Sequence, residues 1–597
     1  MGSVINDFTI SVATVNGSGS QSANNILMRS IFRMGVPVEG KNIFPSNIAG
    51  LPTWFSIRVS DKGYTSRKSK ADIFIAMNKA TCEKDLSKVR SGGLYFYSTA
   101  VKLDESLLPD DLICVPVDFN QLAGEVTQSI QLKKLLVNMV YVGLLAELLK
   151  IPEDVVNETV KFQFKGKESV FKVNQDAVSV GRRYAQEHLQ KLDWPFHVEK
   201  RELTKDKILI DGNTASALGL VYAGCSFASW YPITPSSSLA ESFESFCEQL
   251  RVNKDGEHRY AMVQAEDELA AISMVAGAGW AGGRAMTATS GPGISLMAEA
   301  IGLMYFAEIP GVIWDVQRMG PSTGLPTRTS QGDVLAAARL SHGDTRHPIF
   351  FPSDPAECFE FANLAFDLSE RAQTPVFVLT DLDLGMNFWM SEPFQYPKNP
   401  MDRGKVLNAE DLKRLGEFAR YKDVDGDGIP YRTLPGTPHD LAAYFTRGTG
   451  HDPKAEYSED NVNYQALLNR LDRKWQSIQA LVPPPDIKMS DSGFAVIYFG
   501  STDRIMEEFA ATMGESGKSF SRLRLKAYPF HKDVTDFIRD HKKIFVLEQN
   551  QSGQMRELLS HAYPQWADKF CGLPLSDGMP LSVEELAPKV LQGGLLG

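Results

Sequence analysis

Cysteine is scarce in this chain and never clustered. The 597 residues include six cysteines, and no two of them form a Cys-x-x-Cys pair. This excludes a disulfide framework. It also leaves the chain without an iron–sulfur ligand set of its own, because such sets have short, clustered spacings. The ten histidines are scattered as well. We therefore expect a reduced, cytoplasmic protein with no transition-metal site of its own.

Long apolar runs and basic runs are also missing. The N-terminal MGSVINDFTISVATVNGSG has neither the basic region nor the apolar core of a signal peptide. The most apolar run, residues 135–149, is short for a membrane span and contains Asn138 and Glu147, so we expect a buried helix and no membrane contact. Lys and Arg number 62 against 73 Asp and Glu, a net charge of −11, which does not favour nucleic acid as a partner.

The length predicts several domains, and the pattern divides the chain into four blocks. These are residues 1–195, 205–390, 391–489 and 490–597. The first, second and fourth alternate β-branched runs with helical runs, which is typical of α/β domains. Ala/Gly-rich helices in the second block predict a parallel sheet with closely packed helices. The third block is polar and rich in Pro and Gly, and we interpret it as a connecting segment.

A glycine-containing turn follows the first predicted strand. In NGSGSQS, residues 16–22, Gly17 and Gly19 precede a predicted helix. Backbone N–H groups of such a turn can hold an anion, and a plain tight turn is the alternative. The turn lacks the Walker lysine, and no G-x-G-x-x-G follows any predicted strand. This argues against an ordinary NAD-linked enzyme.

An acidic loop in the third block imitates metal-binding motifs. In DVDGDGIPY, Asp423, Asp425 and Asp427 match the first half of an EF-hand loop, but Leu434 stands where the closing Glu belongs. A weak Ca²⁺ or Mg²⁺ site and a solvated turn both remain open. The Gly-Asp-Gly within it also begins the thiamine-diphosphate/Mg²⁺ motif. The asparagines that should follow come too late, so we interpret this as a chance match.

Two segments of the second block carry candidate chemistry, and a loop with two arginines is a third. Glu266, Asp267 and Glu268 open a helix, where they can complement the helix dipole or, if buried, share a proton with a ligand nitrogen. Ser290-Gly291-Pro292-Gly293 is either a site of close ligand approach or a tight turn.

Two arginines, Arg318 and Arg328, flank a loop after the strand VIWDV. Arginine suits carboxylate recognition, and ligands of open α/β sheets bind where strands end. Surface charge is the alternative for each arginine.

Together these motifs resemble a known family. Five segments resemble the α subunit of 2-oxoacid:ferredoxin oxidoreductases, which are thiamine-diphosphate enzymes that convert 2-oxoacids to acyl-CoA and CO₂. The segments are DGNTASALG, YPITPSS, AEDELAAISMVAGA, MTATSGPG and QRMGPSTGLPTRTSQGD. The first block is similar to the family's γ domain, fused ahead of α. The second is similar to the domain that receives the thiamine aminopyrimidine, and the fourth to a transketolase-C-type domain. RYKDVDGDGIPYRTLPG and RGTGHD most resemble the 2-oxoglutarate branch.

The resemblance implies a role for the YPITP loop. Thr234 is expected beside the thiazolium, donating its hydroxyl to the reacting carbonyl, while Pro232 and Pro235 fix φ and pre-organise the loop. Tyr231 is expected to form a wall of the pocket. Cofactor contacts are expected at Pro232 and in the SGPG turn at Ser290 and Gly291.

The resemblance also implies a cofactor acid and substrate anchors. The family's acid hydrogen-bonds the aminopyrimidine ring nitrogen and favours its imino tautomer, which takes the thiazolium C2 proton. Aligning the helix, with a glycine nine residues after the acid, selects Glu268; aligning the following strand selects Glu266. We prefer Glu268. Arg318 and Arg328 match arginines linked to substrate binding, and two cations suit a dicarboxylate such as 2-oxoglutarate.

The motifs that this chain lacks are the ones expected to be absent from an α subunit of this family. The thiamine-diphosphate/Mg²⁺ signature and the cluster cysteines lie on a separate β subunit, and this chain lacks both. The resemblance implies an active site at the α–β interface, an (αβ)₂ assembly, an iron–sulfur cluster on β, ferredoxin as electron partner and coenzyme A near the first block, where Gly17 and Gly19 would contact it. Alternatives are pyruvate or a branched-chain 2-oxoacid as substrate, and an inactive partner subunit that keeps only the fold.

Overall fold

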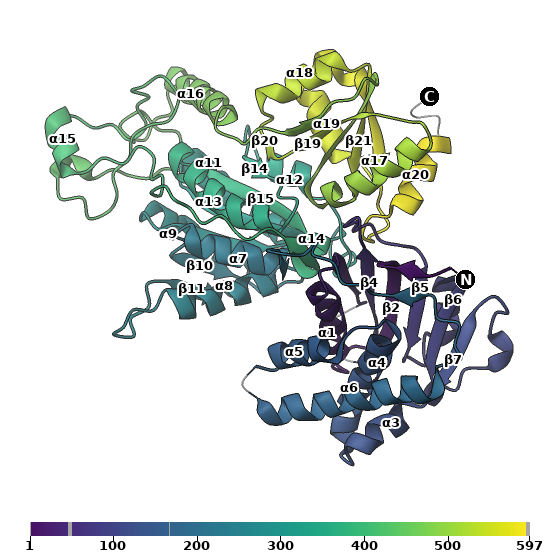
Figure 1. Ribbon diagram of the computed structural model, residues 1–597. Coiled ribbons are helices and arrows are strands. Elements are labelled where there is room, and N and C mark those ends of the chain that lie inside the picture. The colour runs from purple at the N-terminus through teal and green to yellow at the C-terminus, as the bar shows by residue number, and fades with distance from the viewer. Residues whose placement is uncertain (1, 46–49, 166, 593–597) are drawn as a thin grey trace.

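Three larger sheets, of eight, seven and five strands, carry the fold (Figure 1). The computed structural model describes residues 2–45, 50–165 and 167–592. Each α/β block predicted from the sequence contributes most of its strands to one of these sheets, which confirms the multi-domain α/β class. Short 3₁₀ helices occur at η1 (Leu86–Lys88), η2 (Thr99–Val101), η3 (Glu105–Leu107), η4 (Asp440–Ala442), η5 (Gly500–Ile505) and η6 (Pro564–Lys569).

The first sheet has the order β7-β6-β5-β2-β4-β3-β16-β9. The first block supplies β2 (Asp7–Val15), β3 (Val38–Ile43), β4 (Pro52–Ser60), β5 (Ala71–Ala76), β6 (Val89–Ser98) and β7 (Ile113–Val117). Its helices are α1 (Ser20–Arg33), α2 (Cys82–Asp85), α3 (Phe119–Val126), α4 (Ile130–Leu148), α5 (Glu153–Gln163) and α6 (Glu168–His188). A separate two-stranded sheet pairs β1 (Val4–Ile5) with β8 (Phe196–His197).

The apolar run at residues 135–149 is the buried helix that the sequence predicts. It belongs to α4, whose residues 136–146 are all buried against α6, α1 and the first sheet. Among the described residues no single helix has the length and apolar composition of a membrane span. The bent pair α3–α4 meets those two criteria only when its helices are taken together, and they meet at 114°.

Two strands of the first sheet come from outside the first block. β9 (Ile208–Asp211) and β16 (Phe388–Ser391) lie at the two ends of the second block, and they pair with each other antiparallel. β16 then pairs with β3 at Phe388 and Gly40. The predicted boundaries at 205 and 390 place both strands in the second block, whereas the structure places them in the first sheet. They cover the edge of β3, which would otherwise expose unpaired backbone groups.

The second sheet is parallel except for its last strand, and its order is β11-β10-β12-β13-β15-β14-β20. The strands are β10 (Phe227–Trp230), β11 (Ala261–Gln264), β12 (Ala285–Thr289), β13 (Gly311–Gln317), β14 (Ile349–Phe350), β15 (Pro375–Asp381) and β20 (Ala527–Tyr528). The helices are α7 (Gly212–Tyr222), α8 (Ser237–Leu250), α9 (Glu268–Trp280), α10 (Gly291–Leu296), α11 (Ala298–Ala307), α12 (Val334–Ala338), α13 (Pro355–Ala372) and α14 (Leu382–Met386).

Helices of the second block approach their neighbours closely, as its glycines predict. A Cβ atom on Gly219 of α7 would lie 2.4 Å from the backbone oxygen of Phe359 on α13. A Cβ atom on Gly279 of α9 would lie 2.0 Å from the backbone oxygen of Pro310. Both positions therefore require glycine, because no side chain fits between the two backbones.

The polar third block is more ordered than its composition predicts. It contains α15 (Ala409–Leu415) and α16 (Asn461–Gln479). From α16, Arg470 Nη1 and Lys474 Nζ lie 3.1 and 2.9 Å from the buried Glu308 carboxylate at the end of α11. Buried ion pairs therefore attach this block to the second block, an attachment that a search for hydrophobic periodicity does not detect.

The third sheet has the order β17-β19-β18-β21-β22 and belongs to the fourth block, except that β17 lies just before the predicted boundary. Its strands are β17 (Asp486–Lys488), β18 (Phe494–Phe499), β19 (Ser521–Leu525), β21 (Lys543–Glu548) and β22 (Phe570–Pro574), and its helices are α17 (Met506–Glu515), α18 (Lys532–Asp540), α19 (Gln554–Ala562) and α20 (Val583–Gln592). Residues of β13 and β14 share one apolar core with β18, β19 and β21. The second and fourth blocks are therefore packed as one body.

Candidate active site

The candidate site residues of the second block lie at one edge of the parallel sheet. β10, β11, β12 and β13 run parallel, with Trp230 opposite Gln264 and Thr289 opposite Asp315. Each of these strands ends just before a predicted site segment. The carboxyl ends of parallel strands meet at the same edge, which is where open α/β sheets bind ligands.

The YPITP loop is held from both sides. Asn213 Nδ2 donates to the backbone oxygen of Pro235 at 2.9 Å and to Ser238 Oγ at 2.8 Å. Arg318 Nη1 donates to the backbone oxygen of Thr234 at 2.8 Å. Tyr231 and Pro232 are exposed, and Pro235 is buried. The structure therefore brings Thr234 and Arg318 together, and Tyr231 is exposed at the start of the loop.

Glu268 is the buried acid of the acidic segment. It is 6% exposed as the first residue of α9, whereas Glu266 and Asp267 are exposed. Asp267 caps the helix, accepting a hydrogen bond from the Ala270 backbone N–H at 2.7 Å. A Cβ atom on Gly293 would lie 2.8 Å from Glu268 Cγ, so the SGPG turn packs directly on this side chain.

The SGPG turn presents polar groups and little bulk at the same edge. Ser290 is buried, and its Oγ has no hydrogen-bond partner among the described residues. A Cβ atom on Gly291 would lie 2.8 Å from the Asp333 carboxylate. The unpartnered hydroxyl of Ser290, the buried carboxylate of Glu268 and the glycine turn together fit a heteroaromatic ring with hydrogen-bonding nitrogens.

The two predicted arginines occupy different places. Arg318 is nearly buried, and burial lowers its pKa although the Asp333 and Glu268 carboxylates oppose that shift. Arg328 is half-buried, burial lowers its pKa, and its Nη1 donates to the backbone oxygen of Phe44 in the first block at 2.9 Å. Arg328 therefore marks the contact between the first and second blocks.

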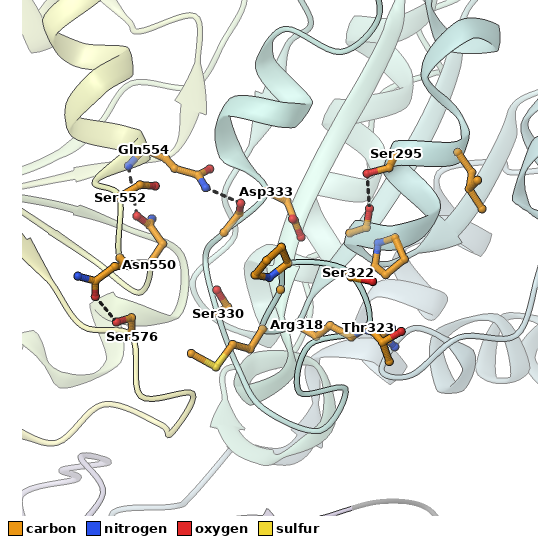
Figure 2. Close-up of a pocket in the computed structure, with 18 residues that line it drawn as sticks. Ser295, Arg318, Ser322, Thr323, Ser330, Asp333, Asn550, Ser552, Gln554 and Ser576 are labelled. Carbon is orange, nitrogen blue, oxygen red and sulfur yellow. Dashed lines mark hydrogen bonds between the residues drawn. The ribbon is translucent and has the colours of Figure 1, made fainter.

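A cavity of about 670 Å³ opens between the second and fourth blocks (Figure 2). Arg318 and Asp333 of the second block face Asn550, Ser552 and Gln554 of the fourth across it. Of the residues predicted from the sequence, Gly291 and Arg318 line the cavity.

Asp333 was not predicted from the sequence, although it stands in the segment TRTSQGD. The buried Asp315 was not predicted either. The available signal for Asp315 was a charged residue within the apolar strand VIWDV.

The glycine turn of the first block lies at a different sheet. Gly17 and Gly19 have φ values of 84° and 80°, left-handed conformations that favour glycine, and Gly19 caps α1. Asn138 Nδ2 of α4 donates to the backbone oxygen of Ser18 at 2.8 Å. Neither glycine lines the cavity described above.

The three aspartates of the third block are not brought together. Asp423 pairs with Arg473 at 3.0 Å, whereas Lys405 lies 2.7 Å from Asp425 and 2.8 Å from Asp427. The ranges that the structure describes contain no group of three or more His, Cys, Asp or Glu side chains arranged for a metal ion. These carboxylates serve ion pairs in the described structure.

Comparisons with known proteins identify the family. Residues 9–184 match the family model of pyruvate ferredoxin/flavodoxin oxidoreductase, and residues 218–420 match that of pyruvate flavodoxin/ferredoxin oxidoreductase, thiamine diphosphate-binding. The 2-oxoglutarate synthase subunit KorA of Methanothermobacter marburgensis is 34% identical over 364 residues, which span 59% of this chain and 89% of that protein. The chain belongs to the 2-oxoacid:ferredoxin oxidoreductase alpha-subunit family.

Two further relatives are similar to this chain over nearly its whole length. Subunit alpha of 2-oxoacid:ferredoxin oxidoreductase 2 from Aeropyrum pernix is 29% identical and covers 93% of this chain and 92% of its own. The solved structure of 2-oxoglutarate:ferredoxin oxidoreductase from Magnetococcus marinus, with 2-oxoglutarate, coenzyme A and succinyl-CoA bound, is 28% identical with a TM-score of 0.87. It covers 98% of this chain and 99% of that one. The family resemblance inferred from the motifs is confirmed.

Proposed function

We propose that this chain is the alpha subunit of a 2-oxoglutarate:ferredoxin oxidoreductase. The reaction converts 2-oxoglutarate, coenzyme A and oxidised ferredoxin to succinyl-CoA, CO₂ and reduced ferredoxin, and it can run in reverse with a low-potential donor. The observation that carries the proposal is the meeting of buried Glu268, the Thr234 loop and Arg318 at one sheet edge, inside a thiamine-diphosphate-binding domain.

The choice of 2-oxoglutarate has three supports. Relatives at 32% and 34% identity are named 2-oxoglutarate synthase subunits. The similar Magnetococcus structure holds 2-oxoglutarate and coenzyme A. Arg318 and Arg328 supply two cations, and a dicarboxylate has two charges to pair with them.

The residues at the sheet edge fit the aminopyrimidine of thiamine diphosphate. Glu268 and Ser290 would hold its polar atoms, and the glycines of the SGPG turn leave room for the ring. When bound, thiamine diphosphate supplies a carbanion nucleophile and an electron sink for cleaving the bond beside a 2-oxo group.

This chain's own side chains then have separate tasks. Glu268 holds a proton at the pyrimidine ring nitrogen. Thr234 donates its hydroxyl to the carbonyl oxygen that gains negative charge, which is the kind of contact that stabilises a transition state. Arg318 pairs with the carboxylate next to that carbonyl and, through its bond to the Thr234 backbone, keeps the loop in place. Arg328 is the second anchor.

A beta subunit completes the site in this proposal. Leu269, Leu296 and Leu325, on α9, α10 and the loop after β13, are 52%, 51% and 51% exposed. Large apolar side chains exposed around a catalytic edge indicate a surface that a partner covers. The beta subunit would hold Mg²⁺, the diphosphate end and the iron–sulfur cluster, and would pass electrons to ferredoxin. The first block, with Gly17 and Gly19, would contact coenzyme A.

Activity of the assembled enzyme tests the proposal. This chain is co-expressed with its beta subunit, and coenzyme A-dependent viologen reduction is measured with 2-oxoglutarate, pyruvate and 2-oxoisovalerate. We expect 2-oxoglutarate to be preferred. Glu268→Gln should lower kcat by about 100-fold or more, because the ring nitrogen loses its acid. Glu266→Gln should retain activity, since Glu266 is exposed.

The alternatives give different results in the same assay. A preference for pyruvate or 2-oxoisovalerate would keep the family and refute the 2-oxoglutarate assignment. Loss of activity in Glu266→Gln but not in Glu268→Gln would refute the assignment of the acid. A well-assembled complex that is inactive on all three acids would favour an inactive partner subunit.

A further inference from the structure

Gln331 is the buried residue in the middle of a segment that lines the cavity. The segment, residues 328–333, leads from Arg328 to α12, and its residues Ser330 and Asp333 line the cavity (Figure 2). Gln331 itself is 1% exposed, and all the hydrogen bonds of its side chain go to the fourth block. We call residues 328–333 the clamped segment.

The side-chain amide of Gln331 joins the ends of two neighbouring strands. β18 and β21 are parallel neighbours in the third sheet, and they end at Phe499 and Glu548. Gln331 Nε2 donates to the backbone oxygen of Phe499 at 3.0 Å, and its Oε1 accepts from the backbone N–H of Gln549 at 3.1 Å. One amide thus satisfies a carbonyl and an N–H that would otherwise be left without partners at the strand ends.

Backbone groups of the clamped segment are bonded to the fourth block as well. The Gln331 N–H donates to the backbone oxygen of Gln549 at 2.8 Å, and Asn550 Nδ2 donates to the backbone oxygen of Gln331 at 2.9 Å. Gln554 Nε2 donates to the backbone oxygen of Gly332 at 2.6 Å. The position of the clamped segment is therefore set by the fourth block, although the segment belongs to the second.

The two ends of the clamped segment hold the neighbours of Arg318. The Met319 N–H donates to the backbone oxygen of Arg328 at 3.0 Å. At the other end, the Asp333 N–H donates to Gln317 Oε1 at 3.1 Å. Arg318 stands between Gln317 and Met319, so a shift of the clamped segment changes the contacts on both sides of this arginine.

We propose that Gln331 is a positioning residue for the 2-oxoacid site. It fixes the clamped segment to the fourth block, and the segment fixes Arg318 at the place where a carboxylate can meet it. This inference rests on the proposed function, since Arg318 is taken there to pair with the 2-oxoacid carboxylate. A two-point contact between a guanidinium and a carboxylate depends on fixed geometry, so loosening the segment weakens binding of the 2-oxoacid.

Gln331→Met tests the proposal in the enzyme assembled with its beta subunit. Methionine is similar in size, but it removes both side-chain hydrogen bonds to the strand ends. We expect KM for 2-oxoglutarate to rise about tenfold. KM for coenzyme A should stay within about twofold of wild type, because the proposed function places coenzyme A at the first block.

Gln373→Met is the matched control. Gln373 is 0% exposed, and its Nε2 donates to the backbone oxygen of Pro430 at 2.6 Å, at the junction with the third block. This variant also removes a buried glutamine amide, so it should lower stability while both KM values stay within about twofold of wild type. The contrast with Gln331→Met separates positioning of the site from general loss of stability.

Gln554→Met is a milder change to the same clamp. Gln554 is partly exposed, so the fold should tolerate the loss of its bond to Gly332. We expect KM for 2-oxoglutarate to rise about threefold. A KM for 2-oxoglutarate within twofold of wild type in Gln331→Met would overturn the proposal, and Gln554→Met decides in the same way if Gln331→Met does not assemble. An equal rise in KM for coenzyme A would also overturn it.

Hydrogen exchange of the assembled enzyme tests the clamp independently of turnover. The N–H groups of Thr329 and Gln331 donate to the backbone oxygens of Gly578 and Gln549. Peptides spanning residues 329–335 should exchange about tenfold faster in Gln331→Met and at the wild-type rate in Gln373→Met. Unchanged exchange in Gln331→Met would show that Gln331 does not hold the segment, and the inference would fail.

The two readouts distinguish failure of this inference from failure of the proposed function. Faster exchange in Gln331→Met, together with a wild-type enzyme that turns over no 2-oxoacid, would refute the proposed function while the clamp stands. Wild-type turnover of 2-oxoglutarate with an unchanged KM in Gln331→Met would refute the positioning role alone.

Discussion

At the scale of single residues, Arg318 combines structural and binding roles. Its Nη1 donates a hydrogen bond to the Thr234 backbone oxygen, and its side chain lines the cavity between the second and fourth blocks. Planar geometry allows these roles together, because the guanidinium presents several donors in fixed directions. A lysine ammonium carries the same charge but lacks that geometry.

This distinction predicts the effect of Arg318→Lys. The charge is kept, but the bond to the Thr234 backbone and the two-point contact with a carboxylate cannot both form. We expect KM for the 2-oxoacid to rise about tenfold and kcat to fall. Steady-state kinetics of the assembled enzyme measure both, with Arg259→Lys, an exposed arginine of the same block, as control. Kinetics of Arg318→Lys equal to those of the control would show that charge alone is sufficient.

Part of the site could be predicted from residue patterns. The motifs locate Glu268, Thr234 and Arg318, because each follows a strand end in a recognisable segment. Their local context does not reveal that Asp333 makes no cap bond to its own helix and lies instead against Gly291 of the SGPG turn. That contact joins residues far apart in the sequence, and the loop just before Asp333 is held by hydrogen bonds between Gln331 and Gln549 of the fourth block.

At the scale of elements, α16 is attached to the second block by buried charge. Glu308, at the end of α11, contacts Arg470 and Lys474 of α16, and all three side chains are buried. Burial opposes ionisation of Glu308, but Arg470 and Lys474 outweigh it and lower its pKa to about 2. The sequence pattern of the third block missed this attachment because it depends on charge pairing across two blocks.

The buried cluster predicts a strong effect of Glu308→Gln. Two cations would remain buried without their counter-charge, and the free energy of unfolding should fall by about 3–5 kcal/mol. Urea unfolding at neutral pH measures this loss. Glu417→Gln, 81% exposed and in the third block, should change stability by less than about 0.5 kcal/mol. A loss for Glu308→Gln as small as for the control would contradict the assignment.

The same cluster has a defined pH dependence. The pKa of Glu308 lies near 4.5 in the unfolded chain and about 2 in the fold. A depressed carboxyl pKa contributes stability that is fully present above the unfolded value and is lost as pH falls toward the folded one. The difference in unfolding free energy between wild type and Glu308→Gln should therefore shrink as pH falls from about 4.5 toward 2. A constant difference over this range would exclude ionisation of Glu308 as its cause.

At the scale of the whole molecule, the first and second blocks are joined by contacts between them as well as by the covalent chain. The first sheet contains strands from both blocks. β16 pairs with β3, Lys41 Nζ of β3 lies 2.9 Å from the Asp383 carboxylate, and Arg328 bonds to Phe44. Predicted boundaries at 195 and 205 follow composition. Strand pairing crosses them, because a strand is assigned to a sheet by its partner rather than by its neighbours in sequence.

Cleavage between the blocks tests this assembly. A protease site inserted at the exposed Asp206, just before β9, would separate residues 1–206 from the rest of the chain. We expect both fragments to elute together in size-exclusion chromatography after cleavage and to separate only in denaturant. Separation in native buffer would show that the covalent connection is required to hold the blocks together.

The pairing of β9 with β16 also restricts motion. The chain leaves the first sheet after β9 and returns to it at β16, so residues 212–387 are attached through two adjacent, hydrogen-bonded strands. A single flexible tether permits rotation about many axes, whereas two strands side by side resist twisting about their own direction. Bending across the ribbon is thus the least hindered rotation of the second block relative to the first. Such a rotation changes the distance between Arg328 and Phe44, where the first and second blocks meet.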